Sequence, residues 1–347
     1  MSCMNTRERI LYQYKKYPQL QIQDLFKFLY QSCFGCEHFV TDFKSATSYI
    51  ESERSFQCTP KEDIEELDGN YVRLYLSYPI LSSTFAKLFM LSAREEKNAI
   101  LNLEIKLNIL ADMVKNKELP FCEKEVHVAI QNWKEKGYPS LHHSQTFRQT
   151  YHPSYRLIKK EFVPFLPVFK FIDRHPSSIL AIDGRCASGK TTLSSLLEKI
   201  YDCNVFHMDD FFLQSEQRSQ ERLNTPGENV DHERFEKEVL KPLKNKQKIS
   251  YIRFDCSTCT LQTPKEMAYK PLNIIEGSYS MHPSLESYYN YKIFLTLQKE
   301  EQLKRLQNRN PSMLNNFIQQ WIPLEEKYFD TFQIQKHCNL SIDTTKA

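Results

Sequence analysis

Apolar residues in the first 160 positions recur at the three- and four-residue spacing of a helix that buries one face. Three such stripes stand out, and the third ends at Gly137, a residue type that commonly follows the last turn of a helix. We therefore expect residues 1–160 to form a mostly α-helical domain with these stripes in its core. The stripes are Ile22, Leu25, Phe26 and Leu29; Ile100, Leu103, Leu107, Leu110 and Val114; and Val126, Ile130 and Trp133.

From residue 178 onward, short runs of β-prone residues alternate with helical runs. Alternation of this kind predicts a parallel sheet that helices cover on both faces. Residues 178–347 are therefore expected to form an α/β domain. The predicted strands are 178–183, 204–209, 271–277, 291–297 and 339–343.

Residues 161–177 lie between the two domains and carry Pro164, Pro167 and Pro176 among several phenylalanines. Proline interrupts helices and removes a backbone donor, whereas phenylalanine favours burial. We expect a packed connector here. The length of 347 residues leaves enough material for a core on each side of it.

The composition, 41% hydrophobic and 26% charged, is that of an ordinary soluble protein. No apolar run is long enough to span a membrane, and the N-terminus lacks the apolar core of a signal peptide, so we expect a cytoplasmic protein without a membrane partner. The formal charge of +3 is too small to indicate nucleic-acid binding. The 10 cysteines are scattered, which favours free thiols. The sequence leaves open whether the protein forms a homo-oligomer.

Candidate chemistry begins with GRCASGKT at residues 184–191, which fits the phosphate-binding pattern G-x-x-x-x-G-K-[ST] at every fixed position. The pattern lies between a predicted strand and a predicted helix over 192–200, the context that this loop requires. Its glycines let successive N–H groups point inward, and the helix start adds the positive end of its dipole. The predicted nucleotide-binding residues are Gly184, Arg185, Cys186, Ala187, Ser188, Gly189, Lys190, Thr191 and Thr192.

Within this loop, Lys190 is expected to reach the outer phosphates of ATP, and the Thr191 hydroxyl to hold Mg²⁺. The N–H dipoles of the loop should also favour the thiolate of Cys186.

Acidic residues end two of the predicted strands. Asp209, with Asp210 in reserve, is our candidate for the base that deprotonates an acceptor hydroxyl, although a helix-capping or solvated acidic turn is the alternative. Glu276 is a candidate Mg²⁺ ligand opposite Thr191, or else a turn residue.

Arg305 and Arg309 share one face of a predicted helix and could close over the phosphates. Alternatively, Glu301 and Arg305 form an ordinary surface pair at i,i+4.

Several short motifs follow the loop in a fixed order: HMDDFF, NVDHERF, YIRFD, IIEGSYSMHPSLESYYNYKIFL, RLQNRN and FIQQWIPLEEKYF. In this order they resemble the uridine kinase family, a branch of the P-loop kinases that also contains phosphoribulokinase and the bacterial pantothenate kinases. The resemblance covers roughly the last half of the chain.

This resemblance implies a five-stranded parallel core with a mobile lid, ATP and Mg²⁺ as cosubstrates, and phosphorylation of a primary hydroxyl on a small sugar-like acceptor. It identifies Asp209 as the catalytic base, Lys190 and Thr191 as the loop residues and Glu276 as the acidic residue of the "EG" motif. By the same resemblance Arg305 is a lid arginine that acts in catalysis.

For the acceptor, the resemblance implies that Asp231 grips ribose hydroxyls and that Gln320 lies nearby, although Asp231 could simply cap the following helix. The chain departs from the family at FDCSTC, where Phe254 and Cys256 replace aromatics and Cys259 replaces the histidine that reads the pyrimidine. Without that histidine, an acceptor other than a nucleoside stays open. The alternative function is a nucleotide-dependent switch or scaffold whose helical domain recognises a partner.

Two cysteine motifs invite further hypotheses. CFGCEH at residues 33–38, with His142 and His143, could be half of a zinc site, although buried thiols are the simpler interpretation. Cys256 and Cys259 form a C-x-x-C without a thioredoxin-like context.

Overall fold

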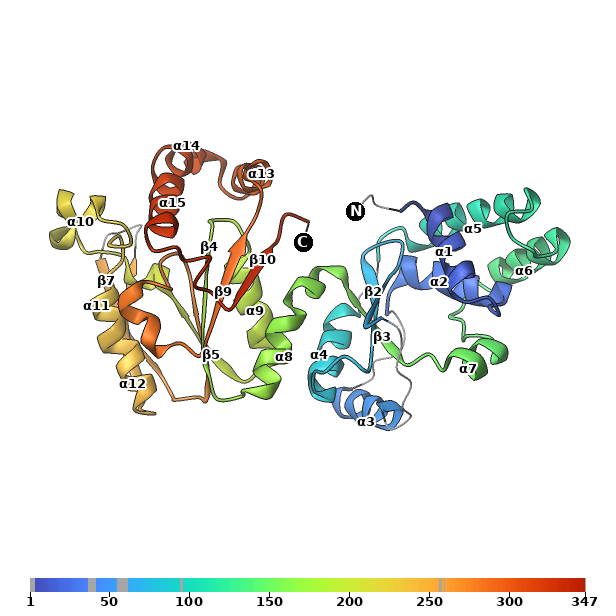
Figure 1. The fold of residues 1–347 in the computed structure, drawn as a ribbon, viewed down its shortest axis with the longest axis horizontal. Helices are drawn as coiled ribbons and strands as arrows, with labels where there is room; N and C mark the ends of the chain where they lie inside the picture. Colours follow the sequence, from blue (N-terminus) through green and yellow to red (C-terminus); the bar gives the residue numbers. More distant parts are fainter. Residues whose placement is uncertain are drawn as a thin grey trace. The chain divides into compact units, whose positions relative to one another are not determined.

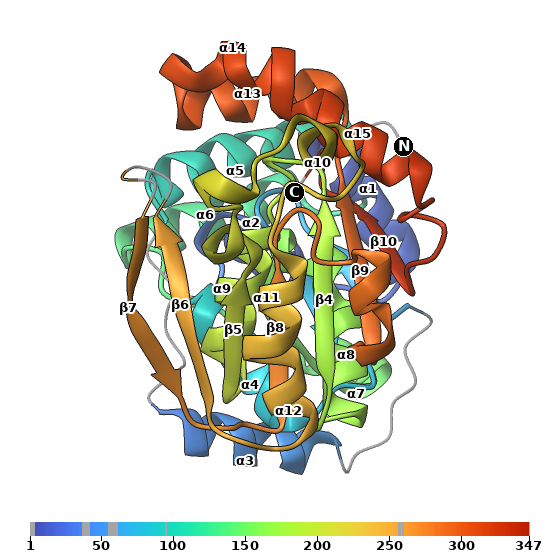
Figure 2. The same ribbon diagram turned by 90° about the vertical axis from the view of Figure 1, so that its left-hand side faces the viewer.

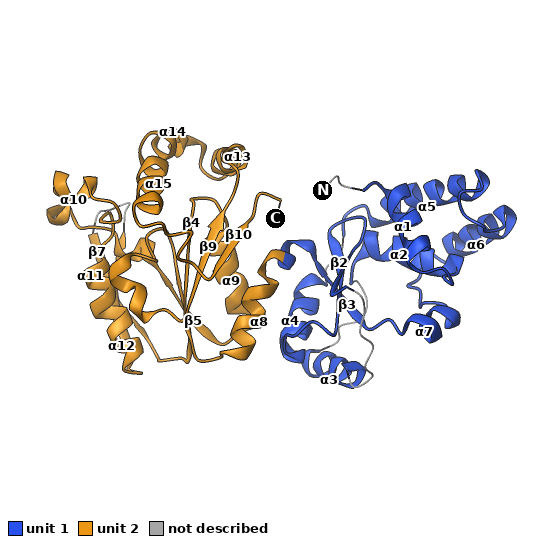
Figure 3. Ribbon diagram, in the orientation of Figure 1, with its two compact units in different colours: residues 1–163 blue, residues 164–347 orange. Residues whose placement is uncertain are grey.

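A computed structural model describes residues 4–36, 42–54, 62–93, 96–255, 258 and 260–346. The chain divides into two compact units, Met1–Val163 and Pro164–Ala347 (Figure 3). None of the helices in these described ranges combines the length and the hydrophobicity needed to cross a membrane.

Unit 1 is mostly helical, as the apolar stripes predict (Figure 1). The three stripes lie on α2, α5 and α6, and most of their residues are buried, but Ile100 is 54% exposed and so does not belong to the core. Gly137 follows α6 with a φ of +73°, the left-handed conformation typical of a residue that ends a helix. The helices are α1 (Thr6–Lys16), α2 (Ile22–Phe34), α3 (Phe43–Arg54), α4 (Ser82–Ser92), α5 (Ala99–Lys115), α6 (Glu123–Glu135) and α7 (Gln145–Tyr151).

Unit 1 also contains an antiparallel sheet that the sequence pattern did not predict. Its order is β1-β2-β3, with β1 (Ile64–Glu66), β2 (Tyr71–Tyr75) and β3 (Tyr155–Lys159). All five residues of β2 are buried, including Arg73, which pairs with Glu65 at 2.9 Å and donates to Gln31. Because both faces of β2 are buried and one of its buried residues is an arginine, its sequence lacks the alternation of polar and apolar residues that predicts a half-exposed strand.

The main sheet of unit 2 has five strands in the order β10-β9-β4-β8-β5, and every neighbouring pair is parallel (Figure 2). If these five strands are numbered 1 to 5 along the chain and read from β5 to β10, the order is 2-3-1-4-5, with β4 at the centre. The strands are β4 (Ile179–Gly184), β5 (Cys203–His207), β8 (Leu272–Glu276), β9 (Tyr291–Thr296) and β10 (Leu340–Asp343). All five predicted strands are confirmed. Their parallel order, with the phosphate-binding loop after the central strand, also confirms the predicted α/β fold of a P-loop NTPase.

Helices cover both faces of this sheet (Figure 1). Helix α9 covers one face, and α11, α12 and α15 pack on the other, where Phe206, Phe235 and Phe329 join one buried cluster. The helices of unit 2 are α8 (Leu166–Arg174), α9 (Lys190–Ile200), α10 (Gln220–Asn224), α11 (His232–Phe235), α12 (Lys241–Lys244), α13 (Lys299–Arg309), α14 (Leu314–Asn316) and α15 (Ile322–Thr331).

The segment interpreted as a connector contains a helix that belongs to unit 2. A 3₁₀ turn at Lys160–Phe165 includes Pro164, and Pro167 lies in the first turn of α8. Proline is tolerated there because the first N–H groups of a helix have no partner within it. The prolines therefore mark where α8 begins instead of preventing it.

An antiparallel hairpin of β6 (Ile249–Asp255) and β7 (Thr260–Met267) forms a separate two-stranded sheet beside β5 (Figure 2). The YIRFD motif lies on β6, and the pairing is irregular between Ile252 and Phe254. Cys256 and Cys259, the C-x-x-C pair, are outside the described residues.

Candidate active site

The loop between β4 and α9 has the backbone geometry that its glycines predict. Gly184 has a φ of +138°, and a Cβ added there would lie 2.0 Å from the carbonyl oxygen of Leu295. Gly189, with a φ of +96°, immediately precedes α9, and Ala187 also adopts a positive φ. Close approach to β9 therefore requires glycine at position 184.

Lys190 turns back over the loop and donates to the carbonyls of Gly184 at 2.6 Å and Arg185 at 3.1 Å. The Ser188 hydroxyl is buried without a hydrogen-bond partner. The Lys190 ammonium lies against the loop, where it can supply the counter-charge of a bound phosphate.

Two neighbouring glutamates of α15 hold the loop from outside. The Cys186 N–H donates to Glu325 at 2.9 Å, and the Ser278 hydroxyl donates to the other oxygen of Glu325 at 2.5 Å. The Arg185 guanidinium bonds both oxygens of Glu326 at 2.7 and 2.8 Å. Both glutamates lie within the motif FIQQWIPLEEKYF, whose sequence alone does not predict a contact with the loop.

The prediction of a thiolate at Cys186 is wrong. Burial raises the pKa of the Cys186 thiol to about 12, and the nearby Glu325 carboxylate adds to this rise. The positive charge of Lys190 lowers the pKa of Cys186, but the two raising effects are larger. The loop N–H dipoles therefore do not prevail over burial and a neighbouring negative charge.

Glu276 ends β8 beside the start of α9. Thr191 Oγ1 donates to its two oxygens at 3.3 and 3.4 Å, and His207 Nδ1 lies 2.5 Å from Oε1. This hydrogen bond to Glu276 raises the pKa of His207. A hydroxyl facing a carboxylate is an all-oxygen pair of the kind that Mg²⁺ prefers, so Thr191 and Glu276 fit the predicted ligand set. His207, which orients Glu276, was missed although it opens the HMDDFF motif.

Asp209 and Asp210 follow β5 in a 3₁₀ turn, Met208–Phe211, but their surroundings differ. Asp210 is buried and accepts hydrogen bonds from Tyr251 at 3.2 Å and Arg253 at 2.9 Å. Asp209 is exposed, and no hydrogen bond reaches its carboxylate from the residues that the structure describes. The Asp210 carboxylate is therefore used in structural hydrogen bonds, whereas the Asp209 carboxylate is available to bind a ligand.

Protein nonetheless crowds the Asp209 carboxyl, and this desolvation raises its pKa. Lys190 and His207 oppose the rise, and the negative charge of Glu276 adds to it. Asp209 thus interacts electrostatically with the loop lysine and with the two residues at the end of the neighbouring strands.

The predicted acceptor residues lie in three different settings. Asp231 is buried and caps α11, since its Oδ1 accepts the Arg234 N–H at 3.1 Å and its Oδ2 accepts Gln217 at 2.8 Å. Phe254 is buried on β6, with the Arg218 guanidinium 5.7 Å from its ring centre. Gln320 is exposed on a π-helical turn, Phe317–Trp321, and is not joined to the loop by any hydrogen bond among the described residues.

Arg305 on α13 forms the predicted i,i+4 pair with Glu301 and also contacts backbone carbonyls of the loop and of the C-terminal segment. Its Nε donates to Glu301 at 2.9 Å, and its other nitrogens reach the carbonyls of Thr344 at 2.7 Å and Ala187 at 3.5 Å. Arg309 and Thr192 are exposed. The second arginine therefore lies in solvent while the first is tied to the loop.

The zinc hypothesis in unit 1 has no support in the described part of the chain. Cys33 and Cys36 are buried free thiols, and His143 pairs with Asp24 at 2.9 Å and with Tyr155. His38 lies outside the described residues.

No model of a known protein family matches the chain, and no curated protein matches it. Among solved structures, a protein from Bacillus stearothermophilus described as a possible uridine kinase is 22% identical, with 48% of this chain and 88% of that chain covered and a TM-score of 0.37. A protein from Silicibacter sp. TM1040 assigned as a fructose transport system kinase is 20% identical, with 47% and 88% covered and a TM-score of 0.37. The fold of unit 2 follows from its own strand order and loop.

Proposed function

We propose that unit 2 is a small-molecule kinase of the uridine kinase type, which transfers the γ-phosphate of ATP to a hydroxyl group. The observations that carry the proposal are the Lys190 ammonium held against the phosphate-binding loop and the exposed carboxylate of Asp209, which accepts no hydrogen bond from the described residues. Phosphoryl transfer needs mainly positioning, charge neutralisation and a proton acceptor, and these residues can provide all three.

In this proposal the loop N–H groups and Lys190 hold the phosphates. Lys190 exchanges its bonds to the Gly184 and Arg185 carbonyls for bonds to phosphate oxygens. Thr191 and Glu276 hold Mg²⁺, which when bound neutralises phosphate charge. His207 keeps the Glu276 carboxylate oriented through its 2.5 Å hydrogen bond.

Asp209 accepts the proton of the acceptor hydroxyl. Its raised pKa strengthens it as a base relative to an ordinary aspartate, while the absence of a hydrogen-bond donor among the described residues leaves its oxygens free for the acceptor. Arg305, anchored at the Ala187 carbonyl, screens negative charge that develops near the loop.

The acceptor is proposed to lie between Asp209 and the β6–β7 hairpin, in contact with Asp231, Phe254 and Gln320. Each Asp231 oxygen already accepts one hydrogen bond, from Gln217 or from the Arg234 N–H, and a carboxylate has lone pairs left to accept one from the acceptor as well. Cys259 stands where the uridine kinase family has its base-reading histidine, so the proposal extends to hydroxylated metabolites other than nucleosides.

The test is ADP release from ATP and Mg²⁺ in the presence of a library of hydroxylated metabolites, nucleosides among them. A kinase gives turnover that depends on one acceptor class, with a phosphorylated product detectable by mass spectrometry. ATP hydrolysis that no acceptor accelerates would instead favour the nucleotide-dependent switch or scaffold.

A further inference from the structure

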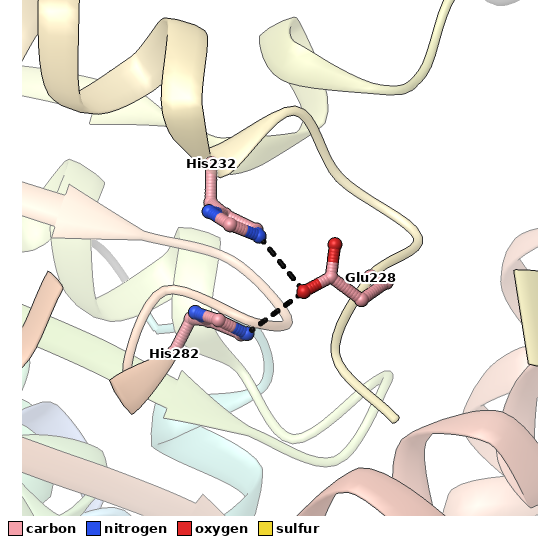
Figure 4. Close-up of side chains that lie close together, drawn as sticks. All are labelled: Glu228, His232 and His282. Carbon is pink, nitrogen blue, oxygen red and sulfur yellow. Dashed lines mark hydrogen bonds and ion pairs between the residues drawn. The ribbon is translucent and has the colours of Figure 1, made fainter. Parts of the chain in front are cut away.

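Three potential metal ligands meet in unit 2 outside the loop region (Figure 4). Glu228 precedes α11, His232 is the first residue of α11, and His282 lies in the segment after β8. Glu228 Oε1 lies 3.0 Å from His232 Nε2 and 3.7 Å from His282 Nε2. The three ligand atoms all lie within 4.8 Å of one another, and both histidines are buried.

The two imidazoles are oriented alike by one shared residue. Ser284 Oγ lies 2.7 Å from His282 Nδ1 and 3.3 Å from His232 Nδ1, so both Nε2 atoms face Glu228. In the metal-free protein His282 Nδ1 accepts from the Ser284 N–H at 3.3 Å, and His232 Nε2 lies at hydrogen-bond distance from the Glu228 carboxylate. Metal binding through both Nε2 atoms requires the Nδ1–H tautomers, in which the Ser284 hydroxyl oxygen can accept from both rings. Histidines that bind metals usually donate their other ring N–H to such a partner.

Charge in this cluster also suits a cation. Glu228 supplies the negative charge. Arg222 lies 3.5 Å from the other glutamate oxygen, Oε2, and does not occupy the Oε1 that both histidines face.

We propose that Glu228, His232 and His282 bind one divalent transition-metal ion, with Zn²⁺ the best match. Two imidazole nitrogens and one carboxylate oxygen form a ligand set typical of zinc, whereas Mg²⁺ prefers oxygen ligands throughout. This site is separate from the Thr191 and Glu276 pair, and it does not depend on the proposed kinase activity.

The two rings are stacked, with centroids 4.1 Å apart and planes 12° from parallel. Ring nitrogen lone pairs lie in the ring plane, so two stacked, nearly parallel rings keep their lone pairs in separate planes that do not meet at a single metal position. Coordination by both Nε2 atoms therefore requires one imidazole to turn about its Cβ–Cγ bond. A metal bound here connects the start of α11, which Asp231 immediately precedes, with the segment after β8. His232 and His282 are 50 residues apart in the sequence.

Cobalt(II) is a suitable probe, because its absorption bands report both coordination geometry and ligand type. Full-length protein treated with chelator and then desalted is titrated with Co²⁺, and Zn²⁺ is then added as a competitor. We expect about one equivalent of Co²⁺ with visible d–d bands, displaced by Zn²⁺, and no thiolate-to-cobalt charge-transfer band. This last criterion separates the site from any site built by the cysteines.

Glu228→Gln preserves side-chain shape, and His282→Gln removes one imidazole. Each is expected to weaken Co²⁺ binding at least about tenfold, whereas His337→Gln, at an exposed histidine, should bind as the wild type does. Circular dichroism without metal checks that the variants fold, and if His282→Gln does not fold, Glu228→Gln alone decides. The proposal is overturned if the wild type binds no Co²⁺, if a charge-transfer band appears, or if Glu228→Gln binds unchanged.

Discussion

Two adjacent aspartates at the end of β5 differ in what their surroundings let them do. Asp210 is neutralised by Arg253 and held by Tyr251, so its charge is already used to attach the β6–β7 hairpin. Asp209 has no such partner among the described residues and interacts with Lys190 instead. The choice between them, open from sequence alone, therefore favours Asp209.

Asp209→Asn tests this choice, because asparagine keeps the shape of the side chain but cannot accept the acceptor's proton. We expect the rate of phosphorylation to fall roughly 100- to 10,000-fold while ATP affinity stays within about twofold. Steady-state kinetics and calorimetry measure the two quantities. Asp202→Asn, at a side chain that is 88% exposed, is the control and should retain full activity. Turnover retained in Asp209→Asn would assign the base elsewhere.

Cys186 should react slowly with alkylating reagents and peroxide at pH 7–8, because only a small fraction of a thiol with a pKa of about 12 is ionised there. The exposed Cys122 provides an internal comparison. Peptide mass spectrometry after timed exposure to iodoacetamide gives both rates in one sample. Faster labelling of Cys186 than of Cys122 would contradict this.

At the residue scale, local motifs predict the loop residues and Asp209 as candidates, but they do not predict side-chain contacts between distant parts of the chain. Glu325 and Glu326 reach the loop from about 140 positions away, and His207 reaches Glu276 from 69 away. Such contacts exist only once the sheet brings the strand ends together.

At the scale of elements, the close approach of β9 restricts which residue can occupy position 184 at the start of the loop. Gly184→Ala places a Cβ against the Leu295 carbonyl and also forces a residue with a side chain into a φ of +138°. We expect a loss of about 3 kcal/mol or more in the free energy of unfolding, from backbone strain and overlap combined. Thermal unfolding of the intact chain measures it.

Gly189→Ala is the matched control in the same loop. A Cβ at this position meets nothing within 4 Å, so only its positive φ is penalised, by roughly 1–2 kcal/mol. Equal unfolding midpoints for the two variants would mean that the close approach of β9 does not constrain position 184.

Element prediction succeeded where hydrophobic runs and punctuating residues agreed, as in the five strands of unit 2. It failed for β2, since Arg73 is buried only because Glu65 and Gln31 compensate its charge and its donors. It also failed for α8, where prolines that interrupt a helix interior instead occupy positions near its start. In both places the outcome depends on partners or positions that the local pattern does not contain.

At the scale of the whole molecule, the two units differ in what the sequence reveals about their function. Unit 2 carries the loop and the acidic strand ends. Unit 1 is built around a buried polar network in which Glu65 accepts from Arg73, Tyr17 and Tyr75. Burial raises the pKa of Glu65, but the Arg73 guanidinium and the Lys16 charge outweigh it and bring this pKa down to about 2.

The stability of the protein should fall below pH 6.5 in part because of His143 in unit 1. Burial lowers the pKa of His143 from 6.5 to about 4, so the unfolded chain binds this proton first and the folded state loses stability as the pH falls through that window. The expected contribution is about 2 kcal/mol between pH 7 and pH 5.

Urea denaturation at both pH values measures this loss. His143→Gln should lose less stability than the wild type over the same interval, while His142→Gln, at an exposed neighbour, should lose as much. An identical loss in all three proteins would exclude His143 as a source.

Calorimetric titration of the folded, full-length protein with ATP, with and without Mg²⁺, tests the central claim most directly. The arrangement of Lys190, Thr191 and Glu276 predicts one ATP bound per chain, more tightly with Mg²⁺, and an affinity at least about tenfold lower for Lys190→Ala. Well-folded protein that binds neither ATP nor GTP in the presence of Mg²⁺ would contradict it.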